Sequence, residues 1–544
     1  MLEPEQNWSR REFVRALGAA GFITAFPAFG GGARPSALDV ITVSILHTTD
    51  LHGHILPTIG YDGTPDVGGL ARCVTQIRRW RRRNPNTILI DVGDVYQGTD
   101  TGLRTRGALM IDLFNHLKVD AWVVGNHEFD WGINPFVAAV QRSRMPVLAA
   151  NMTINGTPAG ELNDARHPFS RVRPYLLKEV GGIRIAVIGI TTPGMRFWFR
   201  PDFTRDLDFL YPVEPVRRAI VQARADGANA IVLAGHMGLK QRGGDDFANT
   251  LVSLTTEFPE VAVVLAGHTH QLVPRRLLNG VLVTQADHFG IHVGRVDLQF
   301  DRDSKRLIGR HAICERMDHR IKPAQVVLSR ARYQLTESAA VLAEPVGELV
   351  ETLHSRTVPA QPSDIESLIG AAIAEALAER GTKVDGVFHG LFDGTRDLPA
   401  GPKTIQDVWN ILPYENFLVT AALTGEQLRD VLEETYATHE NRSLLGFEVR
   451  TEGLGVNRKI ISITPHNPPA SDQRDRFRIA FNTFDSRSAG HKFMKLRAYV
   501  EARESGCEFH DVQTRDALID YFRRHRVVSK ALWQRPMGVA AQAA

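Results

Sequence analysis

The chain has 544 residues, which is more than one hydrophobic core normally holds, so two or three domains are expected. Apolar residues make up 43% and charged residues 23% of the sequence, the balance of a soluble globular protein. The formal net charge of +3 is close to neutral for this length and indicates neither a nucleic-acid binder nor a polybasic membrane anchor. Cys73, Cys314 and Cys507 lie far apart, which excludes a disulfide framework but leaves room for one bridge.

The N-terminus contains two consecutive arginines, Arg10 and Arg11, in the segment Ser-Arg-Arg-Glu-Phe-Val at residues 9–14. The weakly apolar run that follows at 16–29 is shorter than the ~20 residues needed to span a bilayer, so no stable membrane anchor is expected. The pattern resembles a twin-arginine export signal over residues 1–37, with the export machinery as a partner and the periplasm or extracellular space as the destination. The alternative is a short amphipathic helix with two solvated arginines.

Residues 40–301 alternate short β-rich runs with polar turns and helical segments, which is typical of an α/β domain. Nearly all of the runs are apolar on both faces, a pattern that suits central strands of a sheet covered by helices on each side. Ligands of such sheets gather at the carboxyl ends of the strands. The expected strands are 40–47, 87–91, 121–124, 146–150, 183–190, 230–234 and 261–266.

The second half of the chain has a different pattern. A long, largely polar helix is expected at 321–342 and would connect the two halves. Beyond it, Pro- and Gly-marked turns separate helical and β-like runs, which indicates a mixed α+β domain. Its expected elements are helices at 365–380 and 425–439 and a strand at 477–481. The predicted organisation is a signal at 1–37, a first domain at 38–320, a connecting helix at 321–345 and a second domain at 346–535.

Side chains that bind divalent metal ions follow five of the expected strands of the first half. Carboxylate, amide and imidazole groups hold Mn, Fe or Zn in proteins, and two such ions ~3.5 to 4 Å apart form a hydrolytic centre. One such residue alone is weak evidence, but five positions in succession predict a site. The candidates are Asp50, His52, Asp94, Asn126, His127, His236, His268 and His270. The nearby His47 and His54 are expected to be structural.

These residues stand in the motifs Asp50-x-His52, Gly93-Asp94, Gly125-Asn126-His127-Glu128 and Gly267-His268-x-His270. In this order they resemble the signature of the calcineurin-like metallophosphatases, and the extension to Gly132 resembles the 5'-nucleotidase branch. The segments 398–402, 412–416 and 423–428 continue the resemblance into the second half. It implies a four-layer α/β/β/α metallophosphatase domain followed by a mixed α+β 5'-nucleotidase-type C-terminal domain.

The resemblance also implies a role for each residue. Asp94 would bridge two divalent ions, Mn, Zn or Fe, and a hydroxide held between them would attack phosphorus. His127, positioned by Asp130, would stabilise the transferring group or protonate the leaving oxygen. The alternative for Asp130 is a helix N-terminal cap. One ion would be held by Asp50, His52 and His270, and the other by Asn126, His236 and His268.

The substrate-binding half departs from the family pattern. Tyr414 and Phe484 fall near the positions of two rings that clamp a nucleotide base, although both could equally pack the core. Of the family's Asn-Gly-Gly-Gly-Ile-Arg element only a final Gly-x-Arg remains, ending at Arg396. The arginine that the family shows before the helix at 365 has no clear counterpart, although Arg356 lies upstream. Ser-Ala-Gly-His at 488–491 replaces Gly-Gly-Asp-Gly. A nucleotide is therefore a less secure expectation than phosphate ester hydrolysis.

Two other functions share this architecture. Exported thiosulfohydrolases of sulfur oxidation carry both domains and a similar signal, but their segment corresponding to Asn126 and His127 normally lacks this pair. A non-catalytic binding module would be expected to lack several metal ligands, whereas none is missing here. The sequence therefore predicts an exported phosphoesterase that acts on a small phosphate ester or nucleotide.

Overall fold

The computed structural model describes residues 40–533, apart from 163, 165, 200–205, 241–243, 356–360, 392–393, 395, 439, 441, 454–457 and 468–474. The expected export signal with Arg10 and Arg11 lies outside the described residues, as does Arg356. In the part of the chain that is described, no helix combines the length and apolar character needed to cross a bilayer. Cys73, Cys314 and Cys507 are free thiols, so the bridge that the sequence left open does not form.

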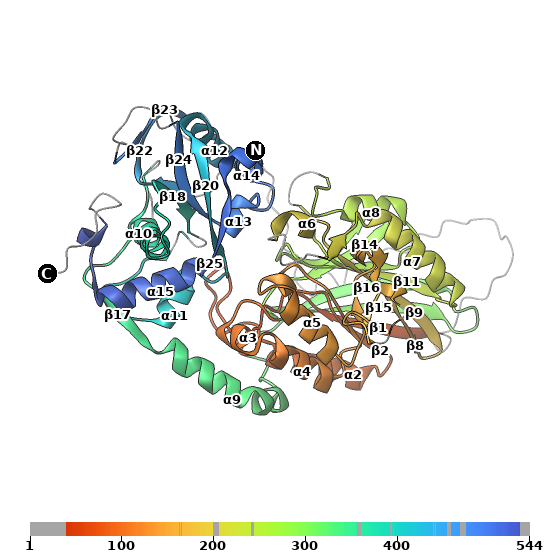
Figure 1. The fold of residues 1–544 in the computed structure, drawn as a ribbon. Helices are drawn as coiled ribbons and strands as arrows, with labels where there is room; N and C mark the ends of the chain where they lie inside the picture. The colour runs from red at the N-terminus through yellow and green to blue at the C-terminus, as the bar shows by residue number, and fades with distance from the viewer. Residues whose placement is uncertain are drawn as a thin grey trace, which may run out of the picture.

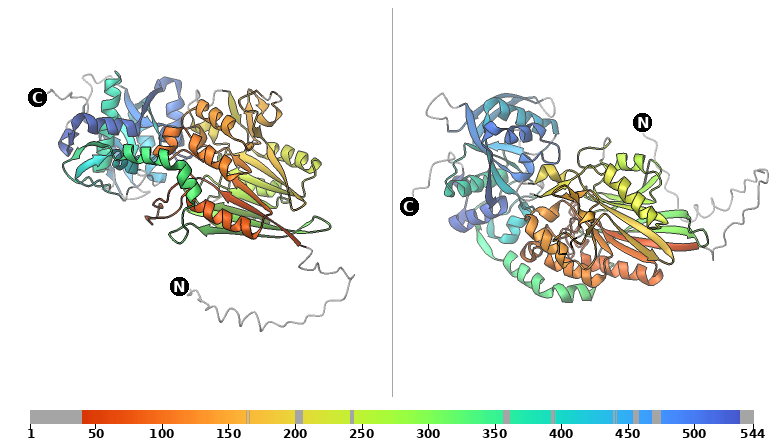
Figure 2. Two further views of the ribbon diagram at one scale, coloured as in Figure 1. Left: turned by 90° about the horizontal axis from the view of Figure 1, so that it is seen from below. Right: turned by 45° about the vertical axis from the view of Figure 1, so that its right-hand side comes forward.

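The chain folds into two parts joined by one long helix, α9 (Gln325–Leu342) (Figure 1). The beginning of α9 packs in the core of the N-terminal part through Val327 and Ala331, and its end contacts the core of the C-terminal part through Val341 and Leu342. Two turned views show the two parts side by side (Figure 2). The helix begins at residue 325 rather than the predicted 321, because Pro323 disfavours a helical conformation at the residue before it.

The first sheet of the N-terminal part has seven strands in the order β16-β15-β1-β2-β3-β4-β7. Strands β1, β2, β3, β4 and β7 are parallel, so their carboxyl ends meet at one edge. Strand β15 pairs antiparallel with β1, and β16 pairs antiparallel with β15 at the edge of the sheet. The bounds are β1 (Val40–Thr48), β2 (Thr87–Asp91), β3 (Ala121–Val123), β4 (Val147–Leu148), β7 (Val172–Arg173), β15 (His292–Asp301) and β16 (Leu307–Arg316).

The second sheet has six strands in the order β13-β14-β12-β11-β9-β8. Its four central strands are parallel, and an antiparallel strand closes each edge. The bounds are β8 (Tyr175–Val180), β9 (Ile183–Thr191), β11 (Ala230–His236), β12 (Val263–Ala266), β13 (Leu272–Leu278) and β14 (Val281–Ala286). Each predicted strand of this half exists, although β4 is only two residues long and β12 begins two residues late.

The two sheets pack against each other, and this corrects the expectation of helices on both faces of one sheet. Val43 and Ile90 of the first sheet share a core with Val187 and Val232 of the second. The outer face of the first sheet is covered by α2 (Leu70–Arg83), α4 (Ala108–Leu117) and α5 (Ile133–Arg142), and that of the second by α7 (Val213–Ala225) and α8 (Leu251–Glu257). An apolar strand face does not reveal whether a helix or a sheet packs against it. The strand pattern alone therefore predicted helices on a face that the other sheet covers.

The remaining elements of the N-terminal part are short. A small sheet of β10 (Leu207–Phe209), β5 (Met152–Ile154) and β6 (Thr157–Pro158) lies beside the main sheets. The helices α3 (Asp100–Thr105) and α6 (Met195–Trp198) and the 3₁₀ turns η2 (His127–Phe129) and η3 (Ala159–Glu161) lie in the connections.

The C-terminal part is a mixed α+β unit, as the sequence predicts. Its main sheet has the order β21-β18-β24-β20-β25, with β18 (Gly386–Gly390), β20 (Phe417–Thr424), β21 (Arg442–Leu445), β24 (Arg476–Asn482) and β25 (Glu508–Gln513). Smaller sheets pair β17 (Pro345–Leu349) with β19 (Gly401–Thr404) and β26 (Val527–Val528), and β22 (Phe447–Glu452) with β23 (Lys459–Pro465). The helices are α10 (Asp364–Glu379), α11 (Ile405–Ile411), α12 (Gly425–Thr438), α13 (Thr483–Ser486), α14 (Met494–Glu501) and α15 (Thr514–His525), and 3₁₀ turns η5 (Arg503–Ser505) and η6 (Lys530–Leu532) complete it.

Candidate metal centre

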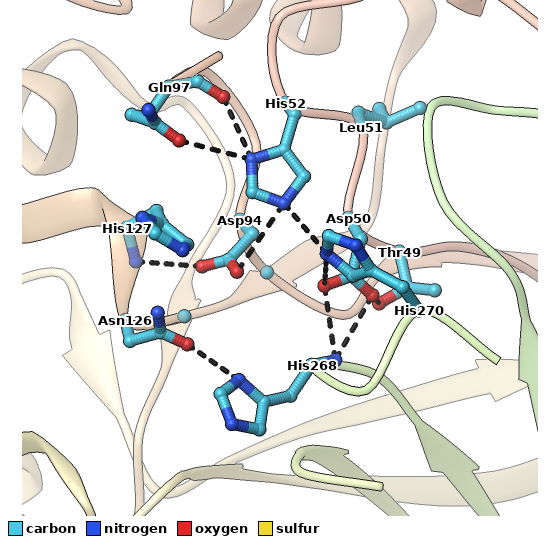
Figure 3. A network of polar contacts seen from close by, with 12 residues as sticks. Thr49, Asp50, Leu51, His52, Asp94, Gln97, Asn126, His127, His268 and His270 are labelled. Atoms are coloured by element: carbon cyan, nitrogen blue, oxygen red, sulfur yellow. Dashed lines mark hydrogen bonds and ion pairs between the residues drawn. The ribbon is translucent and has the colours of Figure 1, made fainter. Parts of the chain in front are cut away.

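The candidate ligands lie at the carboxyl ends of strands from both sheets of the N-terminal part. Those of the first sheet follow β1, β2 and β3, and those of the second sheet end β11 or follow β12. Because the two sheets are stacked, these ends meet at one edge of the sandwich, and Figure 3 shows the side chains pointing toward one another. The residues brought together are Asp50, His52, Asp94, Asn126, His236, His268 and His270.

The ligand atoms form two groups that share Asp94. In the first group, Asp50, His52, Asp94 and His270 place one ligand atom each within 4.8 Å of the others, and in the second Asp94 meets His236 and His268 at the same spacing. The amide oxygen of Asn126 lies 3.1 Å from His236 Nε2 and 2.8 Å from His268 Nδ1, so it joins the second group. A shared carboxylate between two groups is the arrangement that a pair of neighbouring cations requires.

The backbone is strained at this site. Five of the seven residues have a left-handed conformation, which costs a residue other than glycine of order 1–3 kcal/mol. Strain of this kind persists only where the surrounding structure enforces it, and it commonly marks functional sites. The φ angles are 50° at Asp50, 47° at His52, 54° at Asp94, 69° at His268 and 50° at His270.

Two glycines provide the space that these residues need. A Cβ atom on Gly125 would lie 2.3 Å from Asp94 Oδ1, and one on Gly93 would lie 2.8 Å from His236 Nδ1. Gly93 also has a φ of 98°. The Gly-Asp and Gly-Asn pairs of the sequence are therefore explained by close approach of the backbone to the ligands.

The hydrogen bonds of the histidines direct lone pairs into the centre. His52 Nδ1 donates to the carbonyl of Gln97 at 2.9 Å, and His236 Nδ1 donates to the carbonyl of Val92 at 2.7 Å. In the neutral rings each Nε2 therefore carries a lone pair, and these face other acceptors: His236 Nε2 is 3.0 Å from Asp94 Oδ2, and His52 Nε2 is 3.0 Å from His270 Nε2. Facing acceptors repel unless a cation lies between them, so this arrangement fits two metal ions.

The protonation states agree with that interpretation. Burial lowers the pKa of His52 well below its usual value and that of His268 to about 3, so both are neutral, the form that binds metal. At His236 burial also opposes the charge, but Asp94 outweighs it and raises the pKa of the metal-free ring to about 9, so a proton on Nε2 takes the place that a cation would hold. The donors are carboxylate, imidazole and amide groups, a set suited to Mn, Zn or Fe.

His127 and Asp130 form a partly buried pair beside this centre. His127 Nδ1 donates to Asp130 Oδ2 at 2.7 Å, and the backbone N–H of His127 donates to Asp94 Oδ1 at 2.8 Å. Burial opposes the imidazolium, but the carboxylates of Asp130 and Asp94 outweigh it and raise the pKa of His127 to about 10. Asp130 bonds the His127 ring, and the residue at the N-terminus of the following helix α5 is Gly132, so Asp130 is not its cap.

The sequence motifs assigned no role to Glu128. Its buried carboxylate accepts hydrogen bonds from the backbone N–H groups of Asp94, Val95 and Gly125 at 3.1, 2.8 and 2.7 Å. It thereby fixes the loop after β2 to the loop after β3. The only signal was its place in the Gly-Asn-His-Glu motif, which does not reveal that two of its partners, Asp94 and Val95, lie more than thirty positions earlier.

The two histidines expected to be structural lie outside both ligand groups. His54 Nδ1 bonds the carbonyl of Leu51 at 3.1 Å, and its ring stacks on Phe289 at 3.9 Å. His47 is fully buried in β1, where its ring fills the space left by the missing side chain of Gly294. Burial lowers the pKa of His47 to about 3 and that of His54 to about 4.

The three expected substrate residues lie in different surroundings. The ring of Tyr414 stacks with His127 at a centroid distance of 6.0 Å, and its hydroxyl lies 3.2 Å from that of Tyr61, so it reaches the metal centre. Phe484 lies on α13 with 47% of its surface exposed, which is not the burial of a core residue. Arg396 lines a cleft of about 1030 Å³ that begins at His52 and continues between α9 and α11.

The fold and site are those of a known family. The chain belongs to the calcineurin-like phosphoesterases of the 5'-nucleotidase type, because residues 43–272 match the calcineurin-like phosphoesterase model and residues 345–497 match the 5'-nucleotidase C-terminal domain. The resemblance expected from the motifs is thus confirmed, and so is the fold class.

Two curated relatives illustrate the similarity. A trifunctional nucleotide phosphoesterase of Bacillus subtilis is 26% identical over 456 residues, which cover 74% of this chain and 30% of the relative. A probable 5'-nucleotidase of Treponema pallidum is 23% identical over 577 residues, covering 89% of this chain and 92% of the relative. The chain spans about a third of the length of the Bacillus protein.

Two solved structures share the whole fold. A 5'-nucleotidase precursor of Thermus thermophilus is 24% identical with a TM-score of 0.67, covering 90% of this chain and 97% of that one. A sulfate thiohydrolase of the same organism is 19% identical with a TM-score of 0.62, covering 93% and 96%. Because both chemistries occur on this fold, the choice between them rests on the site.

Proposed function

We propose that this chain is an exported dinuclear-metal phosphoesterase that hydrolyses small phosphate esters, with nucleotides as the expected substrate class. The observation that carries the proposal is the pair of buried ligand groups that share Asp94 beside the His127–Asp130 pair. The pair Asn126 and His127, which favours phosphate over thiosulfonate chemistry in the sequence, lies within this constellation.

The ligands divide between two ions as follows. Asp94 would serve both, because its Oδ2 lies 3.7 Å from His52 Nε2 of the first group and 3.0 Å from His236 Nε2 of the second. When bound, two divalent ions would polarise the phosphoryl oxygens and provide an activated water near neutral pH. Asp50, His52 and His270 would hold the first ion, and Asn126, His236 and His268 the second.

His127 is the proposed general acid. Its Nδ1–H is held by Asp130, so Nε2 is the nitrogen free to present a proton to substrate. The raised pKa keeps the ring protonated at neutral pH, when it can stabilise a phosphoryl oxygen or protonate the leaving oxygen. Asp130 fixes the orientation of the ring and favours its charged form.

The leaving group would occupy the cleft between the two parts of the chain. Tyr414 lies beside His127 at its inner end, and Arg396 provides a cation. Tyr414 and the exposed Phe484 are the proposed aromatic contacts of a base, each stack contributing ~1–3 kcal/mol. Since the glycine-rich elements that read nucleotides in the family are altered, we expect modest selectivity for nucleotides over simple phosphate esters.

Export is proposed from the sequence, with residues 1–37 as a twin-arginine signal and the periplasm or extracellular space as the destination. The proposed domain limits are 38–320 and 346–535.

A substrate panel on metal-reconstituted protein tests this function. The panel contains nucleoside monophosphates, cyclic nucleotides, sugar nucleotides, a small aryl phosphate and a thiosulfate-type conjugate. Hydrolysis of phosphate esters that disappears with chelator is the expected result, whereas activity on the thiosulfate-type conjugate alone would replace the proposal with the thiohydrolase function. At saturating metal, Tyr414→Ala should raise KM for nucleotides ~10 to 100-fold and leave the aryl phosphate almost unchanged, and an equal loss on both would assign Tyr414 to folding.

A further inference from the structure

Two consecutive residues of the C-terminal part, Tyr414 and Glu415, reach the metal centre of the N-terminal part. Each ends a short relay of hydrogen bonds that leads to a different histidine of the first ligand group. These two histidines, His52 and His270, face each other through their Nε2 atoms at 3.0 Å. Their Nδ1 atoms are therefore the outer nitrogens, and it is these that the relays contact.

The first relay runs through a tyrosine pair. The hydroxyl of Tyr61 lies 3.0 Å from His270 Nδ1 and 3.2 Å from the hydroxyl of Tyr414. If His270 presents a lone pair at Nε2, its Nδ1 carries the proton and donates to Tyr61, whose own hydroxyl proton is then directed to Tyr414. Tyr61 is further held by a stack on His288 at 4.0 Å, so its hydroxyl is fixed in place.

The second relay contains a buried charge pair. His52 Nδ1 donates to the backbone carbonyl of Gln97 and lies 3.2 Å from its side-chain oxygen. The side-chain amide of Gln97 in turn donates to Glu415, and the other oxygen of Glu415 accepts from Arg515. Both charged side chains are buried, with exposures of 0% for Glu415 and 2% for Arg515, so the carboxylate cannot move away from Gln97 without losing its partner.

The second ligand group is held differently. His236 donates to the carbonyl of Val92, and both His236 and His268 contact Asn126. All of these partners belong to the N-terminal part. The two ion positions therefore differ in which part of the chain orients their histidines.

We propose that the Tyr414–Glu415 segment orients His52 and His270, so that the first ion binds at full affinity only while the C-terminal part is docked. The inference rests on the two-metal function proposed above. Tyr61, Gln97 and Glu415 are then positioning residues, which act through the histidines and not on the substrate. The hydroxyl of Tyr414 has the same role, whereas its ring is the proposed contact of a base. Contact between the two parts and occupancy of the first ion position are linked, and the second position is independent of that contact.

The test uses full-length protein stripped of metal and titrated with Mn²⁺ by calorimetry. Tyr61→Phe removes only the hydroxyl and keeps the stack on His288. Loss of such an outer partner typically weakens metal binding 10 to 100-fold, so one of the two ions should bind that much more weakly while the other is unchanged. Tyr414→Phe should weaken binding of the same ion by a smaller factor, because Tyr61 can still accept a hydrogen bond from His270. Tyr499→Phe is the matched control, since its hydroxyl bonds Asp430 on α12, within the C-terminal part.

A second pair of variants separates positioning from folding. Glu415→Ala and Glu415→Gln both remove the charge opposite Arg515, but only Gln retains an oxygen that can accept from Gln97. We expect Glu415→Gln to bind the first ion more tightly than Glu415→Ala at similar melting temperatures of the metal-free proteins.

The outcomes distinguish the inference from the function on which it rests. Wild-type protein that binds fewer than two ions contradicts the proposed function. Wild-type protein that binds two ions, with Tyr61→Phe and both Glu415 variants binding both as tightly, overturns the inference alone. Equal weakening of both ions, or weakening that follows a lower melting temperature of the metal-free variant, would also overturn it by showing a general structural role.

Discussion

Replacing Asp130 by Asn tests how the protein keeps His127 protonated. The two partly buried side chains are joined by a 2.7 Å hydrogen bond, and the carboxylate raises the pKa of the ring. A hydrogen bond to a charged group contributes about 1.5–3 kcal/mol, and 1.4 kcal/mol corresponds to one pKa unit, so the pKa of His127 should fall by about 1–2 units in Asp130→Asn.

The sign of the effect on activity follows from the direction of the shift. A histidine with a raised pKa is charged below that pKa and loses its proton as the pH rises through it. If the imidazolium is the general acid, kcat declines on the alkaline side, and in Asp130→Asn this decline should begin about 1–2 pH units lower. Bound cations offset the pull of Asp94, so in the loaded enzyme the decline lies below pH 10 even in the wild type.

The assay is the pH dependence of kcat for a small aryl phosphate, with metal content measured at each pH. Asp226→Asn, which neutralises a carboxylate paired with Tyr175 on the second sheet, is the control for charge alone. An alkaline decline at the same pH in the wild type and Asp130→Asn, with both ions retained, would refute the assignment of His127 as the acid. Loss of an ion from Asp130→Asn would instead show that Asp130 supports the metals.

Further predictions concern the ions, the core and export. Asp94→Asn should lower the occupancy of both ion positions, and metal analysis that finds one of them fully retained would contradict a bridging role. His127→Ala should keep both ions and lower kcat by ~10² to 10⁴-fold, whereas an emptied position would make His127 a ligand. Burial lowers the pKa of His47 to about 3, below its unfolded value near 6.5, so stability is lost as the pH falls through this window. One such group removes about 2 kcal/mol between pH 7 and pH 5, and urea unfolding of His47→Leu should lack this loss; an unchanged pH dependence would count against it. Changing Arg10 and Arg11 to Lys should retain the protein in the cytoplasm, and fractionation that shows normal export would exclude the twin-arginine route.

The sequence predicted the strands and the candidate ligands because both depend on short patterns. The run at 87–91 is strand β2 residue for residue, and its successor Asp94 lies where the carboxyl ends of the parallel strands meet. A strand followed by a ligand is a local signal, so seven side chains from five positions could be grouped before any contact was known.

The remaining features depend on contacts between distant residues. Tyr61 and His270 are 209 positions apart, and Gln97 and Glu415 are 318 apart, so no local pattern could show that they touch. The strand pattern alone could not show what covers the strands for a related reason, although the resemblance to the family implied the four layers. An apolar face of β1 has the same composition whether a helix or the second sheet lies against it, and only the tertiary fold distinguishes the two.

The ligands of each proposed ion come from both halves of the sandwich. In the first group, Asp50 and Asp94 extend from one sheet and His270 from the other, and in the second group Asp94 faces His236 across the same seam. Each ion would therefore crosslink the two sheets, which are otherwise held together by side-chain packing. An ion at a hundred times its Kd adds about 2.7 kcal/mol to the folded state, so scarcity of metal in the surroundings would shorten the lifetime of the protein against proteases as well as stop its chemistry.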